Sequence, residues 1–132
     1  MIIWTNGCFD ILHRGHIELF KYAKSLGTKL YVGIDSDAKV KREKGNSRPI
    51  NTSLDRKFML ESIKYIDKVV IFNSREGLED KIEEILPDKM VIGSDWKGKT
   101  VVGARYTNEL VFFDRIEGYS TTEIINGKTN NI

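Results

Sequence analysis

The chain has 132 residues, of which 40% are hydrophobic and 30% charged, and its formal net charge is +2 at pH 7. This length suits one domain with a single hydrophobic core. The small net charge argues against binding to nucleic acid or to a membrane surface, and no apolar run is long enough to cross a bilayer. Cys8 is the one cysteine, so no disulfide can form within the chain, and we expect a cytoplasmic protein.

The first half of the chain predicts two strands and two helices around a long loop. An apolar run at 2–5 predicts a strand, and the amphipathic stretch 15–26 predicts a helix. The run 29–34 predicts a fully buried second strand, and the polar stretch 35–51 predicts a loop. A helix follows over 54–66, with apolar positions at Leu54, Phe58, Leu60, Ile63 and Ile66.

The second half continues the same alternation. Strands are predicted at 68–72, 89–92 and 110–113, and helices at 78–86 and 120–125. Strands that alternate with helices are typical of a parallel sheet covered by helices on both faces. We therefore predict a single Rossmann-like α/β domain with a parallel five-stranded sheet over residues 1–126, followed by a polar tail at 127–132.

Both histidines of the chain lie in the sequence His13-Arg14-Gly15-His16, between the first predicted strand and the first predicted helix. Helix N-termini present unpaired N–H groups and a positive dipole end, so they attract phosphate. Imidazoles placed there can add hydrogen bonds and, when protonated, charge. The motif therefore predicts a polyphosphate site. Helix capping or packing is the alternative, and a metal site would need further ligands whose spacing the sequence does not supply.

Four segments that are rich in polar residues each follow a predicted strand, namely 6–16, 35–44, 93–96 and 115–122. In parallel α/β sheets, ligands bind at the carboxyl ends of the strands, where the chain order reverses. We therefore expect these four segments to converge on one active site.

The histidine motif follows Gly7-Cys8-Phe9-Asp10, and the sequence Gly118-Tyr119-Ser120-Thr121-Thr122 lies near the C-terminus. Together they resemble the cytidylyltransferase-like nucleotidyltransferase superfamily, whose members join a nucleoside triphosphate to a phosphorylated small molecule and release pyrophosphate. The stretches 5–13, 44–51 and 101–104 are similar to bacterial heptose 1-phosphate adenylyltransferases, which also occur as the C-terminal domain of a bifunctional kinase/adenylyltransferase. The stretches 95–96 and 115–118 look more like glycerol-3-phosphate cytidylyltransferase.

The resemblance implies that ATP and heptose 1-phosphate react to give ADP-heptose, with Mg²⁺ bridging triphosphate oxygens, in a homodimer. Transfer from CTP to glycerol 3-phosphate and adenylylation of FMN are alternatives within the class. A nucleotide-binding sensor domain is the alternative outside it. The expected partners are a nucleoside triphosphate and a phosphorylated acceptor, with no nucleic acid and no membrane.

The resemblance also implies roles for single residues. Catalytic roles are implied for His13, His16, Lys44, Ser120 and Thr121. Nucleotide binding is implied for Gly7, Cys8, Phe9, Asp10, Gly15, Gly93, Asp95, Trp96, Arg115 and Thr122. Substrate binding is implied for Asp37, Lys44, Arg48 and Arg56, and Asp37 is the one side chain considered as a metal ligand.

Each of these interpretations has a structural alternative. Asp10 and Asp37 could be turn-forming aspartates, Arg56 a surface arginine, and the stretch 120–122 a plain helix cap. Lys39, Lys41 and Arg42 are interpreted as a solvated part of the 35–51 loop. Cys8 is interpreted as a small buried residue rather than a reactive thiol. Phe58, Phe112 and Phe113 are interpreted as core residues.

Overall fold

The first strand shows how the sequence builds two separate layers of core. In the computed structural model, which describes residues 1–114, β1 spans Ile2–Gly7, and both Ile3 and Trp4 are completely buried. Successive side chains of a strand point to opposite faces of its sheet. Ile3 therefore joins one apolar cluster and Trp4 another. The predictions for Arg115, Ser120, Thr121 and Thr122, and for the boundary at 126/127, lie outside the described residues.

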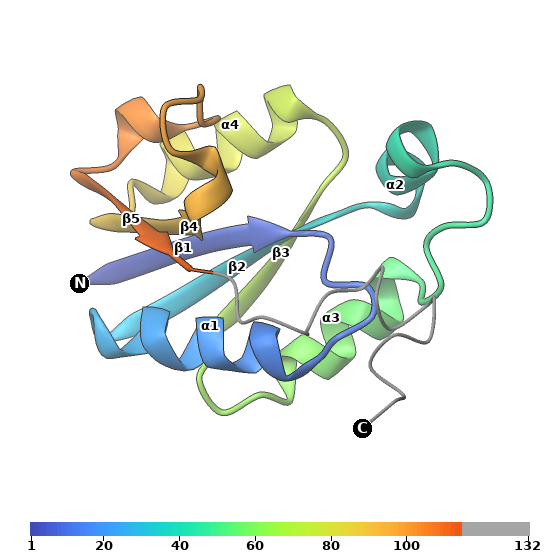
Figure 1. The fold of residues 1–132 in the computed structure, drawn as a ribbon, viewed down its shortest axis with the longest axis horizontal. Coiled ribbons are helices and arrows are strands. Elements are labelled where there is room, and N and C mark those ends of the chain that lie inside the picture. Colours follow the sequence, from blue (N-terminus) through green and yellow to red (C-terminus); the bar gives the residue numbers. More distant parts are fainter. Residues whose placement is uncertain (115–132) are drawn as a thin grey trace.

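Five parallel strands form one sheet, in the order β3-β2-β1-β4-β5 (Figure 1). They are β1 (Ile2–Gly7), β2 (Lys29–Asp35), β3 (Lys68–Phe72), β4 (Lys89–Gly93) and β5 (Glu109–Phe113). The predicted five-stranded parallel sheet is thus confirmed. The chain order reverses between β1 and β4, which is the place where such sheets bind ligands.

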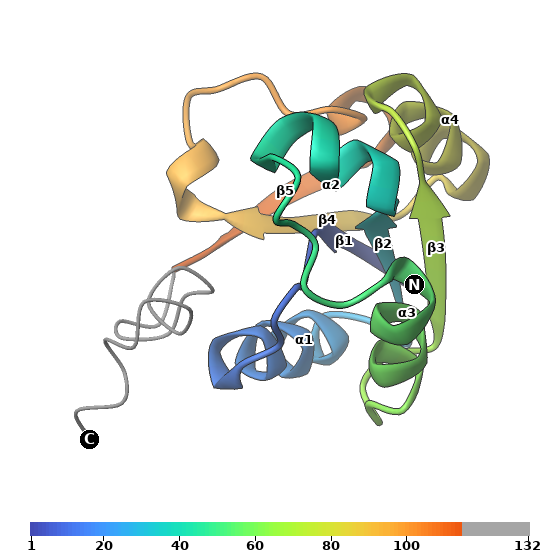
Figure 2. The ribbon, with the colours of Figure 1, turned by 90° about the vertical axis from the view of Figure 1, so that its right-hand side faces the viewer.

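Helices cover both faces of this sheet (Figure 2). One face carries α1 (Arg14–Ser25) and α3 (Ser53–Glu61), and the other carries α4 (Arg75–Ile85) and the 3-10 turn η2 (Ala104–Tyr106). The predicted Rossmann-like architecture is therefore confirmed. No helix among the described residues is long and apolar enough to span a membrane.

The sheet splays at its point of reversal. β1 pairs with β2 along its whole length, up to Gly7 opposite Ile34. With β4 it pairs only as far as Trp4 opposite Met90. Beyond these residues β1 and β4 separate toward their carboxyl ends, and this separation makes room for a ligand.

The prediction of a loop over 35–51 is wrong, because α2 (Asp37–Lys44) lies across the carboxyl ends of the strands (Figure 2). The Ser36 side chain caps this helix by accepting a hydrogen bond from the Lys39 backbone. Gly45, with a φ of 97°, ends it. Val40 is the one buried apolar residue of α2, so the helix lacks the apolar stripe on which sequence prediction relies.

The prediction that Phe58 is a core residue is also wrong, because its side chain is 73% exposed. Arg56 and Leu60 form the buried stripe of α3. Residues two positions away from such a stripe face the opposite side of a helix, so Leu54 and Phe58 point outward. The helix predicted over 54–66 ends at Glu61, and the helix predicted over 78–86 begins earlier, at Arg75, behind the Ser74 cap.

Candidate active site

The two histidines together cap the N-terminus of α1. The Nδ1 atom of His13 accepts a hydrogen bond from the Gly15 backbone at 3.1 Å, and the Nδ1 atom of His16 accepts one from the His13 backbone at 3.2 Å. The rings stack with their centroids 3.7 Å apart. A ring nitrogen that accepts a hydrogen bond carries no proton, so the proton of each ring lies on Nε2. The pair therefore presents N–H donors at a helix end that already favours anions.

The pKa of His16 determines the charge of this member of the pair. Burial and the neighbouring His13 lower the pKa of His16 to about 3, from an ordinary value of 6.5. His16 is therefore neutral at pH 7, and it offers a hydrogen bond rather than a full positive charge. The charge expected of a protonated imidazole is absent at His16 before a ligand binds.

Phe9 supports the histidines from the turn between β1 and α1. Its φ of 52° lies in the left-handed region, which costs a residue with a side chain about 1–2 kcal/mol. Its ring is 7% exposed and packs edge-on against the rings of His16 and Phe20, with centroids 5.2 and 5.1 Å away. This packing offsets the backbone strain and fixes the position of the histidine pair.

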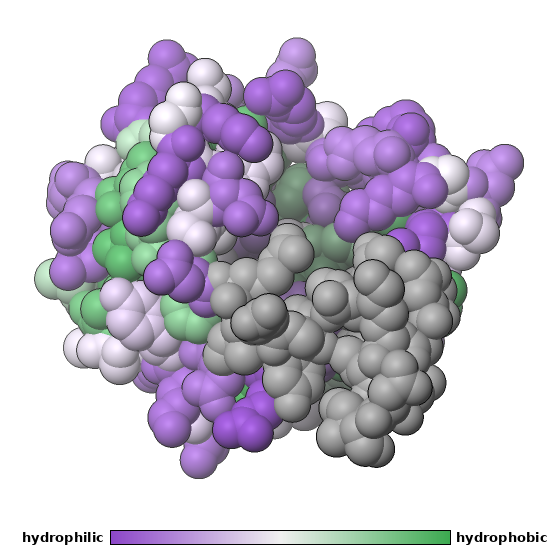
Figure 3. Space-filling model, viewed as in Figure 1, coloured by the Kyte–Doolittle hydropathy of each residue, from purple (hydrophilic) through white to green (hydrophobic). Residues whose placement is uncertain are grey.

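A cavity of about 500 Å³ opens where β1 and β4 separate. Its wall includes Thr5, Asn6 and Gly7 of β1 and Ile92 and Gly93 of β4, all of which lie beyond the last paired residues. Figure 3 shows a hollow there, with apolar side chains at its floor and hydrophilic ones around it. Of the predicted site residues, Gly7, Phe9, Gly93 and Trp96 line this cavity. His13, His16, Lys44 and Arg48 are not part of its wall.

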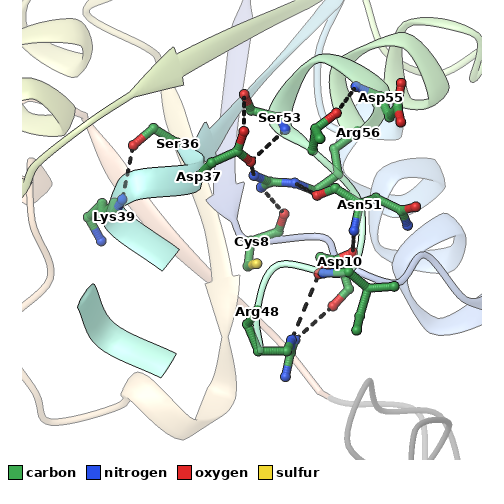
Figure 4. A network of polar contacts seen from close by, with 12 residues as sticks. Cys8, Asp10, Ser36, Asp37, Lys39, Arg48, Asn51, Ser53, Asp55 and Arg56 are labelled. Carbon is green, nitrogen blue, oxygen red and sulfur yellow. Dashed lines mark hydrogen bonds and ion pairs between the residues drawn. The ribbon is translucent and has the colours of Figure 1, made fainter. Parts of the chain in front are cut away.

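Arg56 is neither a surface arginine nor exposed to a substrate, because it is only 1% exposed (Figure 4). Its guanidinium donates to the carbonyls of Asn51 at 3.0 Å and Cys8 at 2.9 Å, and to the carboxylate of Asp37 at 3.0 Å. It thereby ties the turn after β1 to α2 and to the segment before α3. The predicted direct contact of Arg56 with substrate does not fit this position.

Asp10 holds the segment that precedes α3. Its carboxylate is completely buried and accepts hydrogen bonds from the backbones of Ile50 at 2.6 Å and Asn51 at 2.9 Å (Figure 4). This position gives Asp10 a structural role rather than the direct nucleotide contact that the resemblance implied. Arg48 donates to the Asp10 carbonyl at 3.1 Å, and its buried Nε lies 3.8 Å from the Asp10 carboxylate, an ion pair without a hydrogen bond within residues 1–114.

The remaining predicted residues surround this network. Lys44 is exposed at the end of α2, and it makes no ion pair with the part of the chain that the structure describes. Burial raises the pKa of the Cys8 thiol, against the nearby charges of Lys44 and Arg56, which agrees with an unreactive residue. Asp95 and Trp96 form the exposed turn η1 (Ser94–Trp96) after β4.

The Asp37 carboxylate, which was considered as a metal ligand, is engaged by hydrogen bonds from the protein. Its Oδ1 accepts hydrogen bonds from the Ser53 backbone at 2.7 Å and from Arg56, and its Oδ2 lies 3.4 Å from the Ser53 hydroxyl. Within residues 1–114, no group of three histidine, cysteine, aspartate or glutamate side chains could hold a metal ion.

Four charged residues of the cavity wall were not predicted as site residues. They are Asp35, Lys39, Glu43 and Arg75. The interpretation of Lys39 as part of a solvated loop is wrong, because it is 8% exposed. The sequence did carry a signal, since carboxylates stand four positions before and four positions after this lysine.

Comparison with known proteins identifies the family of this chain. A family model described as cytidylyltransferase-like matches residues 4–127. The bifunctional protein HldE of a Nitratiruptor species is 49% identical over 124 residues, which cover 94% of this chain and 27% of that protein. The bifunctional protein HldE of Campylobacter jejuni (strain RM1221) is 48% identical, with the same coverage of 94% and 27%. The chain thus spans about a quarter of the length of these curated relatives.

Two solved structures resemble the fold. The lipopolysaccharide core biosynthesis protein from Thermoplasma volcanium has a TM-score of 0.72 at 25% identity, over 89% of this chain and 98% of that chain. Pantothenate synthetase from Thermus thermophilus has a TM-score of 0.65 at 13% identity, over 98% of this chain and 64% of that chain, and this likeness concerns the fold alone. The family resemblance predicted from the sequence is confirmed, and the chain belongs to the cytidylyltransferase-like family of nucleotidyltransferases.

Proposed function

We propose that this protein transfers the adenylyl group of ATP to heptose 1-phosphate, giving ADP-heptose and pyrophosphate. The observation that carries the proposal is the stacked histidine pair at the N-terminus of α1, whose δ nitrogens are engaged by the backbone. The similarity to bifunctional HldE proteins and to a lipopolysaccharide core biosynthesis protein supports a sugar phosphate as the acceptor.

The chemistry needs positioning more than it needs a strong base. A phosphate oxygen of the acceptor attacks the α-phosphorus of ATP, the bond between the α-phosphorus and the bridging oxygen breaks, and pyrophosphate leaves. Because an ionised phosphate is already a nucleophile, the protein has to align two anions and stabilise the charge that develops. The Nε2–H groups of His13 and His16 suit the α-phosphate, and a bound triphosphate would raise the pKa of His16.

Cations outside the histidine pair suit the remaining phosphates. Lys44 is exposed, and Arg48 places a second positive charge beside Asp10, so both are proposed to contact phosphates of the substrates. Ser120, Thr121, Thr122 and Arg115, which lie outside the described residues, remain proposed phosphate contacts on the strength of the family motif. Gly7, Gly15, Gly93, Asp95 and Trp96 remain proposed nucleotide contacts.

We propose that Mg²⁺ enters with the triphosphate. Oxygens of the triphosphate would bind the ion, because no cluster of protein ligands exists within residues 1–114. The Asp37 carboxylate is already engaged by Arg56 and Ser53. Bound there, the ion would neutralise negative charge on the leaving pyrophosphate. A chelator should therefore abolish transfer without unfolding the protein.

We further propose a homodimer that acts in the cytoplasm. The exposed apolar side chains of Leu54 and Phe58 on α3 are candidates for the contact between subunits, since neighbouring exposed apolar groups favour association. The single cysteine suits a reducing compartment.

The test is pyrophosphate release with Mg²⁺, with ATP or CTP paired with heptose 1-phosphate, glycerol 3-phosphate or FMN. We expect activity with ATP and heptose 1-phosphate, and ADP-heptose as the product by mass spectrometry. The His16→Ala variant should lose at least about a hundredfold in turnover, as expected on removing a donor to the transition state. A fully active variant would overturn the mechanism, and activity only with CTP and glycerol 3-phosphate would change the assigned substrates.

A further inference from the structure

The cavity has two chemically different ends, which lie on opposite sides of β1 in the sheet order. On the β4 side, Ile92, Trp96, Val101 and Val102 make its wall apolar. On the side of β2 and β3, the wall carries the charged side chains of Asp35, Lys39, Glu43 and Arg75, beside the apolar side chains of Phe72 and Leu78. A flat nucleobase suits the apolar and aromatic end. The charged end therefore needs a different occupant.

The charged end is organised around Lys39. Its ammonium group lies 3.0 Å from Oδ1 of Asp35 and 2.8 and 2.9 Å from the two carboxylate oxygens of Glu43. Burial disfavours the charged lysine, but these two carboxylates outweigh it and raise the pKa of Lys39 above its usual value. An ammonium group has three donors, so these contacts use all of them.

This arrangement leaves the charged end without net charge. Two carboxylates face one ammonium and, at Arg75, one guanidinium, so the end has no excess of positive charge with which to attract a phosphate. The histidine pair and the exposed Lys44 are better suited to bind phosphates. An uncharged part of a substrate suits this end better than a phosphate does.

Asp35 is the group of this end that can recognise such a part. Its side chain is 14% exposed, and Lys39 holds its Oδ1 in place. Its Oδ2 makes no hydrogen bond within the described residues and remains an acceptor. A fixed carboxylate oxygen accepts hydrogen bonds from hydroxyl groups, and such charge-assisted bonds are stronger than neutral ones.

We propose that Asp35, held by Lys39, is a specificity-determining residue that binds the hydroxyl groups of the sugar or polyol part of the acceptor. The proposal rests on the proposed transferase function, because it is that function which requires a hydroxyl-rich acceptor beside a nucleotide. It assigns the acceptor to the β2 side of the cavity and the nucleobase to the Trp96 side.

The experiment compares binding of heptose 1-phosphate, inorganic phosphate and ATP to three forms of the full chain by titration calorimetry. The forms are the wild type, Asp35→Asn, and the control Asp80→Asn, which changes an exposed aspartate of α4 outside the cavity wall. We expect Asp35→Asn to lower the affinity for heptose 1-phosphate by at least about tenfold, as for the loss of a hydrogen bond to a charged group. Its binding of ATP and inorganic phosphate should match that of the control.

The outcomes separate the specificity role from mere structural damage. The role of Asp35 is overturned if Asp35→Asn binds heptose 1-phosphate as the wild type does. It is also overturned if this variant binds all three ligands more weakly by the same factor. If this variant does not fold, Glu43→Gln, which keeps the pair of Asp35 and Lys39, should retain sugar-phosphate binding, and its loss would overturn the proposal.

Pyrophosphate release by the wild type tests the proposed function independently. A wild type whose sugar-phosphate binding depends on Asp35 but which releases no pyrophosphate would refute the transferase reaction and keep the inference. An active wild type whose Asp35→Asn variant binds heptose 1-phosphate normally would refute only the inference.

Discussion

Replacing Arg56 with methionine removes a charged group that is 1% exposed and takes one hydrogen-bond donor away from each of three acceptors. Two of these acceptors are the backbone carbonyls of Cys8 and Asn51, and the third is the carboxylate of Asp37. Methionine fills much of the same volume, so the main loss is polar rather than a cavity.

The expected loss follows from these contacts. Breaking a buried ion pair from one side costs about 3–5 kcal/mol, and a single hydrogen bond to a charged group is worth about 1.5–3 kcal/mol. The Asp37 side chain is 37% exposed, so water can replace its lost donor and the lower end applies. We expect the free energy of unfolding to fall by about 3 kcal/mol, which lowers the melting temperature of a chain of this size by about 10 °C.

Thermal melting and urea unfolding measure this loss, with Lys57→Met as the matched control on the same helix. Lys57 pairs with Glu61 at 3.5 Å, with both side chains more than a third exposed, so its loss should cost less than about 1 kcal/mol. If Arg56→Met melts like this control but raises the KM for the acceptor, then Arg56 contacts substrate, as the sequence predicted, and the structural reasoning is refuted.

Three further predictions concern other parts of the molecule. His16 has a pKa of about 3 when folded and an ordinary value of 6.5 when unfolded, so its contribution to stability is full above pH 6.5 and is lost as the pH falls toward 3. In urea unfolding, the free energy of unfolding of the wild type should fall by about 2 kcal/mol between pH 7 and pH 5, beyond any fall in the His16→Asn variant. An equal fall in both proteins would contradict a buried neutral ring. Asp10→Asn places an amide group against two backbone N–H donors and should cost about 2–4 kcal/mol in chemical unfolding, and a cost below about 1 kcal/mol would rule out the buried carboxylate. Replacing both Leu54 and Phe58 by serine should convert a dimer to a monomer in sedimentation without lowering the melting temperature of the monomer, and an unchanged dimer would exclude this face of α3.

The sheet could be predicted because its signals are local. Each strand is a short apolar run, and a run such as 30–34 has the same pattern whatever surrounds it. The histidine pair was visible for a similar reason, since the two histidines and the backbone groups that they cap lie within one helical turn. Both kinds of signal depend on residues that are neighbours in the sequence.

Burial of Arg56 and formation of α2 could not be predicted in the same way. Arg56 is buried because three segments far apart in the sequence supply acceptors for it, and no local pattern records that. The helix α2 has one buried apolar residue, Val40, and is held instead by the ion pairs of Lys39 and by the bond from Arg42 to the Asn73 carbonyl. Apart from the pair of Lys39 and Glu43, which lies within the helix, these contacts exist only once the sheet has formed.

These contacts divide the polar residues of the site into two groups with different consequences. Asp10 and Arg56 have their hydrogen-bonding groups engaged by the protein, so they fix the shape of the turn after β1 before any ligand arrives. Lys44 is exposed and makes no ion pair within residues 1–114, so its charge remains available to anions. A reaction between two phosphates gains most from groups that are already in place when charge develops. Substitutions in the first group should therefore appear in unfolding experiments, and substitutions in the second in the KM for the phosphorylated substrates.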